Sequence, residues 1–134
     1  MRKINRIVIH CSAGSSTQRA SAIIAWHTLP VARGGRGWHA PGYHYIIEAD
    51  GNIVASWPLD RVANGVRGFN ADSIHICYTS GLDACGHPAD TRTPAHDEEV
   101  FPLRSNSAIS SDVKALRCVI SVMFIERRKY NKNF

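Results

Sequence analysis

Residues 4–11 read Ile4-Asn5-Arg6-Ile7-Val8-Ile9-His10-Cys11, and the fold can be worked out from this stretch. It is short, rich in β-branched residues and followed by a polar loop over Ser12–Ser16, which predicts a buried strand. His10 stands where this strand gives way to the loop, so a rigid element can hold its side chain at the edge of a cleft. We therefore take His10 as the first candidate site residue.

Further elements follow along the chain. Thr17 is expected to cap a helix that ends at Pro30, because apolar residues recur there at a spacing of three to four. Residues 31–42, rich in glycine and arginine, predict a loop. The patterns that come next predict strands over Tyr43–Ala49 and Asn52–Trp57 joined by the turn Asp50-Gly51, a strand over Ser73–Thr79, a polar loop over Gly81–Arg92, and a helix that begins at Thr93-Pro94.

This order of elements predicts an α/β fold, with a central mixed β-sheet flanked by helices, in a single domain over residues 1–134. Ile74 and Ile76 should lie on one face of their strand, and His75 and Cys77 on the other. Val113–Ile125 is strongly apolar and fits either a strand or a buried helix.

Composition limits the classes of function. Sixteen Lys and Arg residues against eleven Asp and Glu give a formal charge of +5, which favours polyanionic partners such as nucleic acid, anionic lipid or bacterial wall polymer. No nucleic-acid-binding motif accompanies this charge, so nucleic acid is not the expected partner. No apolar run approaches the roughly 20 residues of a membrane-spanning helix. The four cysteines lack a CxxC pair or a tight framework, so thiols are expected rather than disulfides.

Six motifs then occur in a fixed order: Ile7–Ala13, Trp26-His27, Gly42–Ile47, Asp50–Ile53, Gly68–Ile76 and Gly81–Asp83. This succession resembles the zinc-dependent N-acetylmuramoyl-L-alanine amidase family, which includes amidase-type phage lysozymes and peptidoglycan-recognition proteins. The resemblance covers about residues 4–96. It implies a mixed sheet flanked by helices and a zinc ion held by two histidines and one cysteine.

The resemblance also assigns residues. His10 matches the first zinc ligand, and Tyr43 matches the tyrosine that faces the zinc-bound water and the scissile carbonyl. Three protein ligands leave one position for water, and a nearby phenol can donate a hydrogen bond to the developing oxyanion. Tyr43 and His44 should alternate across their strand, which makes His44 a buried, hydrogen-bonding residue. The candidates for substrate contact are Trp38, Asn64, Arg67 and Asn70, whereas Trp26 and His27 are expected to pack.

The C-terminal segment, residues 97–134, departs from the family pattern. No histidine follows His96, and the one later cysteine, Cys118, has no proline after it. Three explanations stay open. A reading-frame change near residues 96–104 replaced the segment, or a divergent metal site uses Cys118 together with another residue such as His75, or the domain binds without catalysis.

The expected function is hydrolysis of the amide between N-acetylmuramic acid and L-alanine in peptidoglycan, with zinc as cofactor in a site that these residues leave incomplete. The alternative is a non-catalytic peptidoglycan-binding or regulatory module. The apolar run Ile7–Ile9 is too short for a signal-peptide core. We therefore expect synthesis in the cytoplasm and action on the cell wall after release or lysis, as for a phage or prophage endolysin. A monomer is the default expectation for the oligomeric state.

Overall fold

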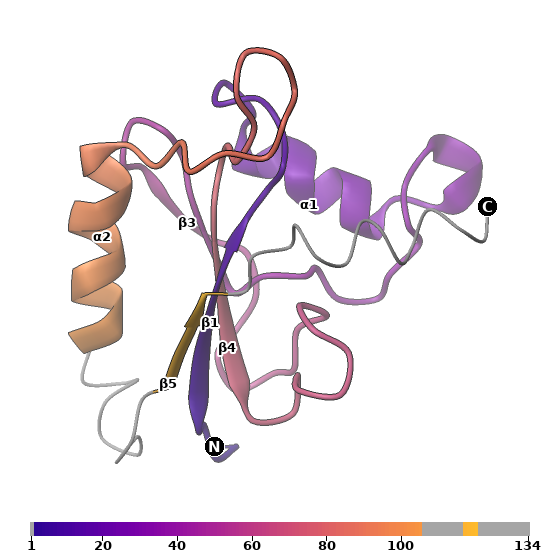
Figure 1. Cartoon of the computed structure of the whole chain (residues 1–134). Helices are drawn as coiled ribbons and strands as arrows, with labels where there is room; N and C mark the ends of the chain where they lie inside the picture. The colour runs from indigo at the N-terminus through magenta and orange to yellow at the C-terminus, as the bar shows by residue number, and fades with distance from the viewer. Residues whose placement is uncertain (1, 106–116, 121–134) are drawn as a thin grey trace.

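A mixed β-sheet organises the part of the chain that the computed structural model describes, residues 2–105 and 117–120 (Figure 1). In chain order the elements are β1 (Arg6–Cys11), α1 (Ala20–Thr28), a 3-10 turn (Val31–Arg33), β2 (Tyr45–Ile47), β3 (Ile53–Ala55), β4 (Ser73–Tyr78), α2 (Pro94–Ser105) and β5 (Arg117–Ile120). The described strands are arranged in the order β3-β2-β4-β1-β5.

Parallel pairing dominates this sheet. β4 lies between β1 and β2 and is parallel to both, and β5 is parallel to β1. β2 and β3 are antiparallel, with Ile46 opposite Val54, so the hairpin predicted around Asp50-Gly51 is confirmed. β5 also shows that Arg117–Ile120, within the predicted apolar segment, is a strand. The remainder of Val113–Ile125 lies outside the described residues.

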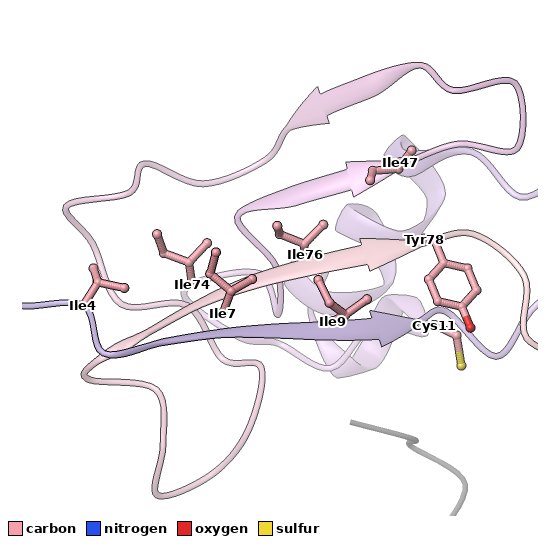
Figure 2. Close-up of a cluster of buried hydrophobic side chains, with 8 residues drawn as sticks. All are labelled: Ile4, Ile7, Ile9, Cys11, Ile47, Ile74, Ile76 and Tyr78. Carbon is pink, nitrogen blue, oxygen red and sulfur yellow. The ribbon is translucent and has the colours of Figure 1, made fainter. Parts of the chain in front are cut away.

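The sheet has two chemically different faces. On one face a cluster of isoleucines from β1 and β4, including Ile7, Ile9, Ile74 and Ile76, forms the main core (Figure 2). The ring of His96 in α2 contacts Tyr78 at the edge of this cluster, with ring centroids 5.3 Å apart. α2 therefore covers this face, as the alternating pattern of β4 requires.

The other face carries buried histidines rather than isoleucines alone. His10 of β1 and His75 of β4 are fully buried, and Cys77 lies beside them in a second cluster with Ala20 and Ile23 of α1. α1 and α2 thus lie on opposite sides of the sheet (Figure 1). The predicted mixed sheet flanked by helices is confirmed.

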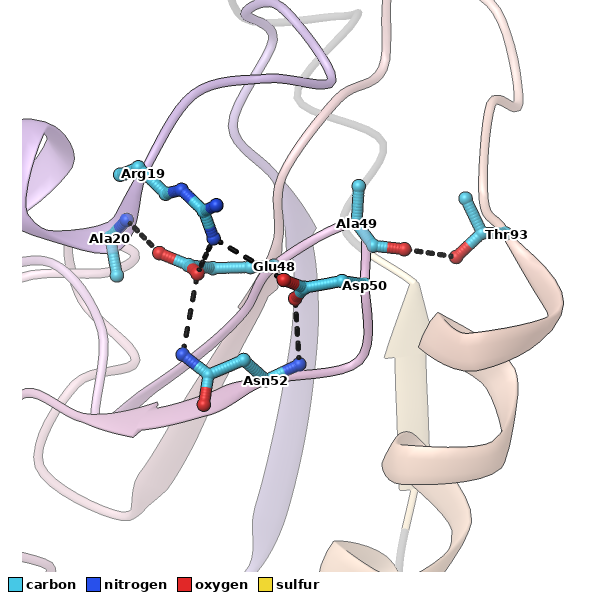
Figure 3. Close-up of polar contacts among 7 residues, drawn as sticks. All are labelled: Arg19, Ala20, Glu48, Ala49, Asp50, Asn52 and Thr93. Carbon is cyan, nitrogen blue, oxygen red and sulfur yellow. Dashed lines mark hydrogen bonds and ion pairs between the residues drawn. The ribbon is translucent and has the colours of Figure 1, made fainter.

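The start of α1 differs from the prediction. Thr17 does not cap the helix, because α1 begins at Ala20 and its N-cap residue, Arg19, makes no side-chain cap. Instead the buried carboxylate of Glu48, at the end of β2, accepts the Ala20 N–H at 2.8 Å and the Arg19 guanidinium at 2.6 Å (Figure 3). A carboxylate at a helix N-terminus is favoured both by the unpaired N–H groups and by the helix dipole. A residue distant in sequence therefore supplies the cap.

α2 begins as predicted. The Thr93 hydroxyl accepts the His96 N–H at 3.2 Å, and His96 Nδ1 accepts the Thr93 N–H at 3.0 Å, a reciprocal cap with Pro94 at the first helical position. The helix continues through Pro102 to Ser105.

Two other expectations concern cysteines and membranes. The cysteines whose side chains are described, Cys11, Cys77 and Cys85, are thiols as expected. Neither of the two described α-helices has the length and apolar character needed to cross a bilayer.

Glu48→Gln should destabilise the fold by about 1 kcal/mol at pH 7, because charged hydrogen bonds are worth more than neutral ones. Hydrogen bonds from Ala20 and Arg19 hold the pKa of Glu48 below its usual value despite burial. The stabilisation by the Glu48 carboxylate is therefore fully present above the pKa of an unfolded glutamate, and it is lost as the pH falls through the pKa of Glu48 in the folded protein. Urea unfolding at pH 7 and at pH 3 measures both effects. Asp50→Asn, at an exposed carboxylate 3.3 Å from the same guanidinium, is the matched control and should change stability little. Equal effects of the two substitutions would contradict the capping role.

Candidate functional site

The structure brings His10 and Tyr43 together. His10 is the fifth residue of β1 and is fully buried, and Tyr43 precedes β2 and is 6% exposed. Their ring centroids lie 5.0 Å apart at an angle of 48°. Two segments more than thirty residues apart in sequence thus place an imidazole beside a phenol, as the resemblance predicts.

His75 completes a buried group around His10. β1 and β4 pair so that Val8 is level with His75 and His10 with Cys77. The two imidazoles meet across this register, with His10 Nε2 and His75 Nδ1 2.9 Å apart, a hydrogen-bond distance. His75 was a candidate metal ligand in the sequence, and its proximity to His10 fits a role at the same site.

The expected alternation of Tyr43 and His44 is wrong in its geometry. β2 begins only at Tyr45, so the two preceding residues do not follow the two-residue period of a strand. The Tyr43 ring packs against His10, and the His44 ring stacks on His75 with centroids 5.9 Å apart. Both side chains therefore lie on the histidine side of the sheet. His44 is buried and hydrogen-bonded, as predicted.

Burial keeps these rings neutral. Desolvation lowers the pKa of His10 to about 3 and of His75 to about 2, with neighbouring histidines adding smaller effects in the same direction. Burial also raises the pKa of the Tyr43 hydroxyl well above its ordinary value, and that hydroxyl hydrogen-bonds with Cys77. At neutral pH the site therefore holds uncharged imidazoles and a protonated phenol.

An aromatic layer leads from this buried group to the surface. The His27 ring lies 5.3 Å from Tyr43 and stacks on Trp38 at 5.0 Å. Outside it, the Arg36 guanidinium lies between Trp38 and Trp26, 4.9 and 4.6 Å from their ring centroids. His27 packs as expected, and Trp26 contacts it while staying 48% exposed. The exposed Arg36 and its two tryptophans form the outer rim of the candidate site.

The other predicted contact residues do not lie together. The Asn64 amide donates to the carbonyl of Ala40 at 2.9 Å, so this side chain ties two loops together. The Asn70 side chain accepts the Val66 N–H at 2.7 Å just before β4 begins, at the end of the sheet away from His10. Arg67 is exposed in the same turn. Substrate contact by these three residues stays a prediction, and the contacts of Asn64 and Asn70 are those of turn residues.

The atoms of His10 fit a metal ligand. Its Nδ1 is buried and, in the described structure, makes no hydrogen bond, whereas its Nε2 faces His75. A metal-binding histidine usually binds through one ring nitrogen and hydrogen-bonds through the other, and the two ring nitrogens of His10 allow that arrangement. The register of β5 places Cys118 level with Ile7, three residues before His10, and its side chain lies outside the described residues.

A different trio was missed in the sequence. Among described residues, Asp83, Cys85 and His87 are the one group of three whose ligand atoms all lie within 4.8 Å of one another. All three are exposed on the loop after β4. The spacing Asp-x-Cys-x-His within five residues was the available signal. This trio is distant in the chain from His10 and has to be controlled for in any metal measurement.

Comparison with known proteins finds a family model and a curated relative that match most of the chain. A family model described as N-acetylmuramoyl-L-alanine amidase matches residues 1–101. The endolysin of Klebsiella phage KP32 is 35% identical over 96 residues, which are 70% of this chain and 60% of the phage protein. The chain thus spans less than two thirds of that relative's length.

Solved structures show the same fold. The N-acetylmuramoyl-L-alanine amidase LysC from Clostridium intestinale superposes with a TM-score of 0.67 at 19% identity, covering 96% of this chain and 87% of that one. Drosophila PGRP-LB also gives a TM-score of 0.67, at 15% identity, covering 87% of this chain and 69% of that one.

The buried histidines predict a fold that acid weakens. Burial lowers the pKa values of His27 and His44 to about 4, and those of His10 and His75 further. An unfolded histidine titrates near pH 6.5, so below that pH the unfolded chain takes up protons that the folded chain does not. Stability should therefore fall as the pH drops from 7 to 5, by up to about 1.4 kcal/mol per pH unit for each such histidine. Urea unfolding at several pH values measures this, and a flat profile over the range would contradict the burial of neutral rings.

Proposed function

Because the chain belongs to the N-acetylmuramoyl-L-alanine amidase family, we propose that it is a peptidoglycan amidase domain that hydrolyses the amide between N-acetylmuramic acid and L-alanine. The observation that carries this proposal is the buried pair of His10 and Tyr43, with ring centroids 5.0 Å apart. The match to phage endolysins supports the same substrate.

His10 would hold the zinc ion of this family through Nδ1, the buried nitrogen that makes no hydrogen bond among the described residues. When bound, zinc supplies a Lewis acid and lowers the pKa of a bound water to about 7. The sheet fixes the His10 backbone by its register with Cys77, and the contact with His75 fixes the ring. This support allows one imidazole to keep a single orientation.

Tyr43 would stabilise charge on the substrate carbonyl. Its hydroxyl stays protonated because burial raises its pKa. It would donate a hydrogen bond to an oxygen that becomes negative in the transition state by giving up its hydrogen bond with Cys77. The ring is held between His10 and His27. The position of the ring is therefore set before the reaction, and only the hydroxyl proton has to change partner.

The alternative is a module that binds peptidoglycan without cleaving it. One observation favours it: in the described part of the chain, no group of three metal ligands includes His10. The further ligands would have to come from residues outside the described ranges, because the register of β5 places Cys118 level with Ile7 and not with His10. The three explanations for residues 97–134 lead to different outcomes here, since a replaced segment removes the ligands and a divergent one supplies others.

The setting follows from the proposed substrate. Peptidoglycan is an extracellular polymer, so we propose that the protein is made in the cytoplasm and reaches the wall after release or lysis, as an endolysin would. The net charge of +5 suits an anionic wall. We propose that the protein is a monomer.

The amidase proposal predicts new free α-amino groups on L-alanine when the protein is incubated with purified walls and zinc. His10→Ala should abolish their release, and Tyr43→Phe should lower the rate by about 10²-fold, the usual cost of removing an oxyanion donor. Amino-group labelling followed by identification of the terminal residue measures the reaction.

Zinc content separates the two functions. Measurements should use a Cys85→Ser background, because the exposed loop of Asp83, Cys85 and His87 can bind zinc independently. Zinc that His10→Ala removes, together with release of L-alanine amino groups, supports the amidase. If the protein contains no zinc and releases no amino groups but is still retained on walls, the domain is a binding module.

The rim of Trp26, Arg36 and Trp38 predicts a contact surface for the glycan or stem peptide. Trp38→Ala should weaken binding to insoluble peptidoglycan by about tenfold, the loss expected for a buried aromatic anchor. Phe69→Ala is a matched control, because Phe69 is 52% exposed and also carries an arginine over its ring. Pull-down at a series of wall concentrations measures both variants. Equal binding by the two would place the contact surface away from Trp38.

A further inference from the structure

We infer that His75 is a positioning residue for His10, which accepts the His10 Nε2–H and so leaves His10 Nδ1 unprotonated and available to a metal. The 2.9 Å contact between the two rings is an observation of the structure, whereas the direction of its proton rests on the proposed function. The metal-binding consequence rests on the proposed function.

The contact is built into the sheet. β1 and β4 are adjacent and parallel, and their register sets the two rings with centroids 5.1 Å apart. His10 Nε2 and His75 Nδ1 lie 2.9 Å apart, and both rings are fully buried. The backbone of two paired strands therefore holds this contact, with no loop between the two residues and the sheet.

One proton must lie between the two nitrogens, and its source decides the chemistry. Each ring keeps one other buried nitrogen that makes no hydrogen bond in the described structure, His10 Nδ1 and His75 Nε2. If His10 donates, its Nδ1 carries a lone pair. If His75 donates instead, His10 Nδ1 carries a proton and cannot bind a metal. Metal-binding histidines almost always donate their second N–H to a neighbouring acceptor, and that arrangement gives His75 the acceptor role.

His75 is itself held in place by contacts with His44. Its backbone N–H donates to His44 Nδ1 at 3.0 Å, and the two rings stack with an interplanar angle of 11°. Because His44 Nδ1 accepts this N–H, the proton of the neutral ring lies on Nε2. That nitrogen donates to the carbonyl of Arg61 at 3.0 Å and also lies 2.9 Å from the Arg2 guanidinium. The His44 imidazole, itself held by the Arg61 carbonyl, thus supports the ring that contacts His10.

The loop beside His75 is shaped for its ring. A Cβ atom on Gly65 would lie 2.3 Å from His75 Cγ and Nδ1, closer than Cβ atoms in proteins ever approach such atoms. Gly65 has no other requirement of this kind, because its backbone φ is not positive. The imidazole at position 75 and the missing side chain at position 65 are therefore a matched pair.

This role differs from that of a second zinc ligand. To bind the same ion through Nδ1, His75 would have to give up its contact with His10, and its Nε2 lies on the far side of the ring from that contact. The two readings predict different behaviour when the ring is replaced. His75→Asn keeps an acceptor near the position of Nδ1, whereas His75→Leu keeps the bulk and removes the acceptor.

The first measurement uses the full chain without metal. Two-bond ¹H–¹⁵N correlation spectra of histidine-labelled protein report which ring nitrogen carries the proton, with His10→Gln used to assign the signals of His10. We expect His10 in the Nε2–H form in the wild type and in His75→Asn, and a mixture of both forms in His75→Leu. A wild-type His10 protonated on Nδ1 would overturn the inference, whether or not the protein is an active amidase.

The second measurement is cobalt binding in the Cys85→Ser background, followed by the visible absorption of the ion. Affinity should fall by about 10- to 100-fold in His75→Leu and stay within about threefold of wild type in His75→Asn. The absorption bands should keep their positions in both variants. Two outcomes would make His75 a ligand and overturn the positioning role. One is that both variants lose cobalt binding as completely as His10→Ala does, and the other is that the absorption bands shift in His75→Asn. The protonation form of His10 in the wild type decides the inference by itself if His75→Leu does not fold or the chain binds no cobalt.

Discussion

The parallel pairing of β1 with β4 is the constraint on which the rest of the described structure depends. Both strands are buried on both faces, so neither can shift by one residue without moving isoleucines to the histidine side and histidines into the apolar core. The register also fixes the depth at which His10 stands relative to Cys77. Core packing and site geometry are thus two results of one set of backbone hydrogen bonds, and a change that harms one will harm the other.

The two faces of the sheet contribute differently to stability and to the candidate site. The isoleucine face supplies most of the apolar burial, and α2 closes it. The other face buries polar rings, which costs free energy unless each ring finds partners. The partners here are mostly other rings and backbone groups, so the polar cluster has little freedom to rearrange. Such rigidity suits a site whose groups must keep one orientation.

The sequence predicted the parts of this protein that local patterns control. Alternation in β4, the Asp50-Gly51 turn and the cap of α2 by Thr93 each depend on neighbouring residues, and each is confirmed. The cap of α1 could not be predicted, because Glu48 is 28 residues away from the N–H that it accepts. Tyr43 was matched to its neighbourhood by family resemblance, whereas the contact of His10 with His75 needs the register of two strands, which no local pattern contains.

The remote cap of α1 bears on how the chain acquires its structure during synthesis. The helix is nine residues long and lacks a side-chain cap of its own, so a nascent chain that ends before the hairpin has little to hold it helical. Glu48 leaves the ribosome after the whole of α1 has been made, and β4 follows later still. The histidine face therefore stays unprotected until about residue 78 has emerged, since its central strand is the last of its parts to be synthesised. Chaperones that bind exposed apolar segments would encounter this chain before β1 and α1 have packed against β4. A translation pause before β4 would prolong that exposure.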